Sequence, residues 1–320
     1  MKRAIRPEDG IIVYLIALGL YQIVGMIVNI AVKDKGDAYI FIAYALPQIF
    51  YVATAAVYFA VRKISFSPLP ARGDVKAIHY VFASVVGLGL FFFALLPNHG
   101  WTELFRILGR PLSVTVPKMD TPVNIVFGVL VICLLPAVGE ELIFRKVFCD
   151  AFAPYGKIPA ILFSGVLFGL GHFNLAQTLH QIVLGVVLSY IYVKTKNVTL
   201  TSVIHFGNNF LALFTTKFTG EEPWTNWIVL GVCCAVGAVL LAGGLTYFVL
   251  KTPRLPTKGK WVSAREKSAQ ESSETEIVAI YTDGEKFVPT VTEVREKPSL
   301  YFWVFFGTIA LFWLIAAIVG

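Results

Sequence analysis

Long apolar runs separated by short charged connections dominate the chain. Most runs approach or exceed the roughly 20 residues that an α-helix needs to cross the hydrocarbon core of a bilayer. The pattern predicts nine such helices, of which the fifth and sixth are the least clearly divided. Their predicted bounds are 11–32, 39–61, 78–96, 122–141, 158–175, 176–193, 198–217, 226–250 and 300–319. We therefore predict an all-α polytopic membrane protein with eight to nine transmembrane helices.

The positions of Lys and Arg predict how these helices are oriented. Basic residues gather before the first run, in the second, fourth and sixth connections, and after the eighth run. Because Lys and Arg favour the cytoplasmic side, the N-terminus is predicted inside and Gly320 outside. The connection 97–121 also carries basic residues and weakens the contrast. Short loops favour the plasma membrane of a prokaryotic cell as the location.

Composition supports the membrane assignment. The chain is 57% hydrophobic and 15% charged, whereas soluble domains are roughly half apolar and about one quarter charged. This excludes a soluble enzyme, a disordered protein and a small disulfide scaffold. The net charge of +7 comes largely from residues that end apolar runs, so no nucleic-acid partner is expected. The four cysteines lack metal-binding spacing and are interpreted as packing residues.

The chain divides into five parts by this pattern. Residues 1–121 are N-terminal transmembrane helices, 122–217 a helical core, 218–250 an additional helix, 251–299 a charged cytoplasmic segment, and 300–320 a C-terminal helix. The charged segment begins as a polar, Ser-rich linker. Two alternating runs, 276–282 and 285–289, then flank an Asp-Gly pair, which predicts a β-hairpin. A charged cytoplasmic linker throughout would explain the same residues.

Polar residues inside apolar helices are costly and therefore informative. The first group is Glu140, Glu141 and Arg145. Adjacent helical residues point in different directions, and Glu141 can pair with Arg145 four residues later. That leaves Glu140 free for chemistry, although solvated glutamates at a helix end would explain the same pattern. The second group is Phe168 and His172, one helical turn apart; a histidine here could simply bond a backbone carbonyl.

The third group is His205 and Asn209, which project from one helical face. His180 has no comparable partner and is interpreted as structural or cavity-lining. With straight helices, His172 would lie about 21 Å along the fifth run, deeper than Glu140 and His205. The side chains can converge only if the fourth helix continues past Arg145, or if the fifth is tilted or begins later.

This set of side chains suits peptide hydrolysis within a membrane. A carboxylate can take a proton from water, a histidine can orient that water, and a histidine–amide pair can donate to an oxyanion. Glutamate and histidines could equally hold Zn²⁺, with Glu140, His172 and His205 as ligands. The HExxH spacing is absent, so a metal does not follow from the pattern.

The three motifs resemble those of the CPBP intramembrane proteases, also called type II CAAX prenyl endopeptidase-like or Abi proteins. Their pattern is EExxxR, FxxxH and HxxxN/D on successive helices, and all three occur in order within residues 122–217. The resemblance implies that Glu140 activates water with assistance from His172. It implies that His205 and Asn209 line the oxyanion side or help to hold a metal. Supporting roles fall to Glu141, Arg145 and Phe168.

By this resemblance, the protein is expected to be an intramembrane endopeptidase, for which a metalloenzyme and a metal-free mechanism are both argued. Its partner would be a membrane-tethered or lipid-modified peptide, such as a prenylated CAAX tail. Two alternatives remain open at this point. One is a non-proteolytic immunity or assembly protein that uses the same cavity. The other is a proton-coupled transporter, since buried Glu and His groups also relay protons.

Overall fold

The computed structural model describes residues 5–33, 36–64, 75–219, 225–252, 259–262 and 293–319. Three helices precede the core: α1 (Pro7–Ala31), α2 (Asp37–Val61) and α3 (Ala77–Ile107). The core contains α4 (Pro122–Gly128), η1 (Val129–Leu134), α5 (Leu135–Glu140), η2 (Glu141–Cys149), η3 (Ala153–Tyr155), α6 (Lys157–Leu170), α7 (Leu175–Thr195) and α8 (Val198–Thr219). Two further helices follow: α9 (Trp227–Lys251) and α11 (Leu300–Val319).

The helices form one bundle that a membrane can enclose. Within the described residues, seven helices are long and apolar enough to span a bilayer, and the continuous helix Pro122–Cys149 is one of them. Helix α6 has only 14 residues, and α8 is not among the seven. The prediction of an all-α polytopic membrane protein is confirmed.

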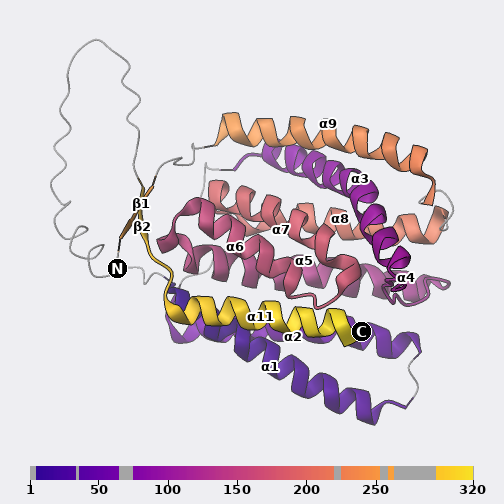
Figure 1. The fold of residues 1–320 in the computed structure, drawn as a ribbon, viewed down its shortest axis with the longest axis horizontal. Helices are drawn as coiled ribbons and strands as arrows, with labels where there is room; N and C mark the ends of the chain where they lie inside the picture. Colours follow the sequence, from indigo (N-terminus) through magenta and orange to yellow (C-terminus); the bar gives the residue numbers. More distant parts are fainter. Residues whose placement is uncertain are drawn as a thin grey trace.

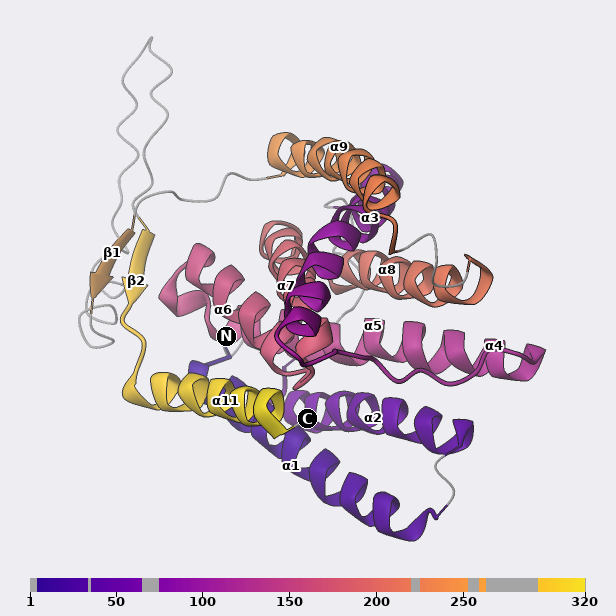
Figure 2. The same cartoon turned by 45° about the vertical axis from the view of Figure 1, so that its right-hand side comes forward.

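The core helices lie between two outer groups. Helices α1, α2 and α11 cover one side, and α3 with α9 cover the other (Figures 1 and 2). The N-terminus lies at one end of the bundle and the C-terminus towards the opposite end (Figure 1). The indole N–H of Trp313 in α11 donates to Thr178 Oγ1 of α7 at 2.7 Å, which ties an outer helix to the core.

The fourth helical run is longer than the sequence pattern predicts. Thr121 caps its start by accepting the Asn124 N–H at 3.1 Å, and Pro122 occupies the first helical position. The run then continues through two π-helical stretches, η1 and η2, and ends at Cys149. The predicted end at residue 141 is therefore wrong, because Arg145 after it is buried among helices rather than solvated.

The fifth helical run is shorter than predicted. Helix α6 stops at Leu170, so the predicted bound of 175 is wrong, and His172 lies in the turn that follows. Close packing positions this helix against α7. A Cβ atom added to Gly165 would lie 2.6 Å from the backbone nitrogen of Val186, so only glycine permits this approach. The short α6 and the extended fourth run together bring His172 to the level of Glu140.

The segment after α9 contains a small sheet rather than linker alone. Strand β1 (Gly259–Val262) pairs in parallel with β2 (Glu293–Glu296), with Gly259 opposite Glu293. The predicted hairpin over 276–289 lies outside the described residues.

Asp150 connects three parts of the core just beyond the fourth helical run. Its carboxylate accepts from Lys146 and from Lys196, each at 2.7 Å, and from the Tyr192 hydroxyl at 3.1 Å. Burial raises the pKa of Asp150, but the charges of Lys196 and Lys146 outweigh it, so the pKa lies below its ordinary value. The ionised carboxylate therefore stabilises the fold above about pH 4, and this contribution is lost as the pH falls through the lowered pKa.

We expect Asp150→Asn to lower the free energy of unfolding by about 1 kcal/mol at neutral pH, because two cations lose their partner. Thermal unfolding in detergent at several pH values measures this. The difference from wild type should shrink below about pH 4. Asp120→Asn is the matched control, since Asp120 accepts from the Asn124 amide at 3.2 Å and has no cation partner among the described residues. A difference that does not depend on pH would contradict the electrostatic explanation.

Candidate active site

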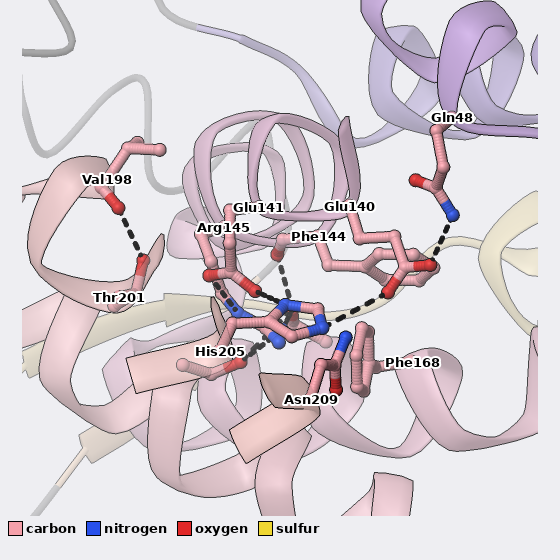
Figure 3. A network of polar contacts seen from close by, with 12 residues as sticks. Gln48, Glu140, Glu141, Phe144, Arg145, Phe168, Val198, Thr201, His205 and Asn209 are labelled. Carbon is pink, nitrogen blue, oxygen red and sulfur yellow. Dashed lines mark hydrogen bonds and ion pairs between the residues drawn. The ribbon is translucent and has the colours of Figure 1, made fainter. Parts of the chain in front are cut away.

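Glu140 lies at the centre of the predicted constellation. It ends α5 and is 7% exposed. Its Oε1 accepts the side-chain N–H of Gln48 from α2 at 2.6 Å (Figure 3). Its Oε2 is buried without a hydrogen-bond partner among the described residues, and lies 3.9 Å from His172 Nε2 and 3.7 Å from His205 Nε2. One oxygen is therefore held in place while the other faces two imidazoles.

The hydrogen bonds of His172 determine where its proton lies. Its Nδ1 is 2.7 Å from the carbonyl oxygen of Phe168, one turn earlier. Because a carbonyl can only accept, Nδ1 carries the hydrogen and donates. Nε2 then faces Glu140 Oε2, and in the neutral tautomer it presents a lone pair there. The Phe168 ring packs edge-on against His172, with centroids 5.0 Å apart.

His205 also donates from Nδ1, but to a carboxylate instead of a backbone carbonyl. Its Nδ1 lies 3.0 Å from Glu141 Oε1, and a carboxylate can only accept, so Nδ1 again carries the hydrogen (Figure 3). The ring is 1% exposed. The two adjacent glutamates thus flank one imidazole: Glu141 fixes Nδ1, and Glu140 faces Nε2. The sequence-based expectation that Glu140 and Glu141 point in different directions is met by this geometry.

Glu141 and Arg145 form a fully buried ion pair. Arg145 Nε donates to Glu141 Oε2 at 3.0 Å, and both side chains have no exposed surface. The guanidinium also donates to Ser189 at 3.1 Å and to Ser164 at 3.4 Å, and it lies 4.7 Å from the centre of the Phe168 ring. This confirms the predicted i,i+4 pair and rules out the alternative of solvated glutamates.

Asn209 is positioned by a break in the helical hydrogen bonds of the fourth run. In a regular helix, the carbonyl of Ile132 would accept from residue 136, but Pro136 has no N–H. The Asn209 Nδ2 donates to this carbonyl instead, at 3.2 Å. The π-helical geometry of η1 around Ile132 has the same origin, because a proline and an inserted side chain both disturb the helical ladder. One amide hydrogen of Asn209 remains for another acceptor.

All four predicted site residues line one cavity of about 1040 Å³. Its wall is built from α1, α2, α3, the segment before α4, α5, the α6–α7 turn, α7, α8 and the start of α9. His180 also lines it, as predicted, and its Nε2 lies 3.1 Å from the amide nitrogen of Asn208. Glu140, His172, His205 and Asn209 are therefore brought together, and a small molecule has space beside them.

Three acceptor atoms face one another beside Glu140 and can bind one small molecule between them. Glu140 Oε2 and the two Nε2 atoms are all acceptors when the imidazoles are neutral. Their separations of 3.7 and 3.9 Å exceed the roughly 3.4 Å between ligands of tetrahedral zinc with bonds near 2.1 Å. Among the described residues, no group of three His, Cys, Asp or Glu side chains is arranged to hold a metal ion. A metal held by Glu140, His172 and His205, as considered from the sequence, therefore stays a prediction.

Gln48 is a site residue that the sequence analysis missed. It is 5% exposed and reaches Glu140 from α2, far outside the three motifs. A Cβ atom added to Gly139 would lie 3.0 Å from the backbone oxygen of Gln48, so the glycine lets α2 approach closely. The signal was a lone amide directly after Pro47 inside an apolar run.

The core of the chain matches a known protein family. Residues 122–211 match the family model described as Type II CAAX prenyl endopeptidase Rce1-like. All three motifs fall inside the matched residues, so the predicted family resemblance is confirmed for the core of this chain. No curated protein and no solved structure matches the chain. At the level of the family, the match supports a CAAX-type peptidase of the membrane acting on membrane-associated substrates.

Proposed function

We propose that this protein is an intramembrane endopeptidase in which Glu140 activates the attacking water. The observation that carries the proposal is the unpartnered Oε2 of Glu140, buried within 4 Å of two imidazole Nε2 atoms at a large cavity. A buried carboxylate oxygen without a donor is costly unless a ligand or water satisfies it. The Rce1-like match supports peptide hydrolysis as the chemistry.

In this mechanism, Glu140 Oε2 takes one proton from water, and the water oxygen forms a bond to the scissile carbonyl carbon. His172 Nε2 accepts a hydrogen bond from the second O–H of the water, without taking its proton, and so orients the nucleophile. The carbon–nitrogen bond then breaks, and Glu140 returns its proton to the departing amine. The second water hydrogen stays with the new carboxyl group until it ionises, so the step balances without a further reactant.

His205 and Asn209 are assigned to the developing oxyanion. The free amide hydrogen of Asn209 can donate to it, and so can Nε2–H of His205 when that ring is protonated. Glu141 accepts from His205 Nδ1 and stabilises the charged ring, while Arg145 fixes Glu141. Because these donors are already in position before the reaction, little free energy is spent on reorganising them during it. Glu141, Arg145 and Phe168 are thus positioning residues.

The proposed substrate is a membrane-tethered peptide, with a prenylated CAAX-type tail as the first choice. Besides Glu140 and its polar neighbours, the cavity wall contains many apolar side chains that suit a lipid-modified peptide; they include Leu18, Tyr21, Phe91, Leu95, Leu213 and Leu230. We also propose the plasma membrane of a prokaryote as the location, on the short connections between helices.

The test is cleavage of a fluorogenic prenylated peptide by the purified protein in detergent, with and without a metal chelator. Because the proposed mechanism uses only side chains, we expect the rate to change by less than about twofold on chelation, well inside the effect of removing a general base. Loss of activity that added Zn²⁺ restores would overturn the metal-free mechanism and keep the peptidase. No cleavage of this or related membrane peptides would count against the function itself.

A further inference from the structure

The connection between α3 and α4 contains a segment with an unusual backbone. Residues 111–117 have no regular secondary structure, and their backbone N–H groups make no hydrogen bond within the part of the chain that the structure describes. Figure 2 shows this connection as a drawn-out trace between the end of α3 and the start of α4. Pro111 and Pro117 bracket it, and the residue before a proline favours extended backbone.

The segment lies on the wall of the cavity that holds Glu140. Val114 and Val116 both line this cavity, with 38% and 44% of their surfaces exposed. Thr115 between them does not line it. From Val114 to Val116 the side chains alternate as in a β-strand, in which successive residues point to opposite faces. The alternation ends at Pro117, which lines the cavity directly after Val116. The backbone from Val114 to Val116 therefore behaves as a single strand beside the cavity.

One contact holds this strand from the side of α2, and two more hold Lys118 beyond Pro117, where the strand ends. The Tyr44 hydroxyl of α2 donates to the Thr115 carbonyl at 2.8 Å. Asp37 accepts the backbone N–H of Lys118 at 2.9 Å, and the Asn124 amide donates to the Lys118 carbonyl at 3.0 Å. In a strand, the N–H and C=O of one residue point to the same edge, and those of the next residue point to the other. Thr115 thus faces α2, and Val114 and Val116 present the free edge.

We propose that the Val114–Val116 edge binds the substrate peptide by strand addition. The inference rests on the proposed function, because its occupant is the substrate of the Glu140 site. A membrane peptide must leave the helical conformation before its scissile carbonyl can be attacked, and each backbone group left unpaired in an apolar setting is costly. Val114 and Val116 offer N–H groups and carbonyls that have no hydrogen-bond partner among the described residues, and pairing with them satisfies the peptide's groups and fixes its register. The ligand class is an extended polypeptide, recognised through its main chain.

The experiment uses Glu140→Gln protein and a fluorescent prenylated CAAX-type peptide, with binding measured by fluorescence anisotropy. A series of peptides carries one backbone N-methyl group each, at successive positions. We expect methylation to raise Kd about tenfold at alternate positions and by less than about twofold at those between, because only alternate N–H groups face the edge. Equal effects at neighbouring positions, or no binding, would overturn the proposal.

Two protein variants test the same edge by removing backbone N–H groups from the protein instead of the peptide. Val114→Pro removes an N–H from the free edge and should raise Kd about tenfold, whereas Thr115→Pro removes one that faces α2 and should change Kd less than about twofold. If Val114→Pro fails to fold, the peptide series decides alone. Cleavage that persists in Glu140→Gln would reject the proposed mechanism while leaving an alternating pattern valid. If cleavage depends on Glu140 but the peptide series shows no alternation in Kd, only the strand-addition proposal is rejected.

Discussion

Glu140→Gln is expected to slow peptide cleavage by about 100- to 10,000-fold, the range for removal of a general base. The amide cannot take a proton from water. The fold should remain intact, because a glutamine oxygen can still accept the Gln48 N–H that now reaches Oε1 at 2.6 Å. Initial rates on the prenylated peptide, together with thermal unfolding of both proteins, measure the two effects separately.

Glu103→Gln is the matched control for this change. Glu103 accepts from Arg106 at 2.8 Å and does not line the cavity. Its replacement should leave cleavage within about twofold of wild type, since a surface ion pair contributes little. Cleavage that survives in Glu140→Gln would show that another group activates the water. Equal losses in both variants would point to a general effect of lost charge.

The core of the candidate site was predictable because a membrane makes polar residues conspicuous. Glu140, His172, His205 and Asn209 each interrupt an apolar run, and the i,i+4 spacing of Glu141 and Arg145 predicted their ion pair. Spacing alone left solvated glutamates as an equal alternative. Only tertiary packing, which buries both members of the pair, decides between them.

The missed features depend on contacts between distant segments or on helix geometry. Gln48 joins the site through a contact 92 residues along the chain from Glu140, and no local pattern encodes that distance. The fourth run continues through two π-helical stretches to Cys149, and the sequence pattern contains no signal for them. Apolar content alone did not place the end of α6 at Leu170, because the short turn 171–174 leads directly into the apolar start of α7. The parallel pairing of β1 and β2 spans about thirty intervening residues.

Arg145→Met is expected to lower the free energy of unfolding by about 3–5 kcal/mol, the usual cost of removing one member of a buried ion pair. Methionine fills much of the volume, but Glu141 then keeps a buried charge without its guanidinium, and its remaining partners include His205 and Thr201. Ser189 and Ser164 also lose their guanidinium donor. Thermal or denaturant unfolding in detergent measures the loss.

Two further variants distinguish the free-energy cost of losing the ion pair from the cost of losing the arginine side chain. Arg106→Met removes an exposed arginine from a comparable ion pair with Glu103 and should cost less than about 1 kcal/mol. Glu141→Gln added to Arg145→Met removes the stranded charge, so the double variant should be more stable than Arg145→Met alone. A double variant that is less stable, with losses that simply add, would mean that packing rather than charge sets the cost. Because Glu141 also fixes His205, the double variant should remain a poor peptidase even where its stability recovers.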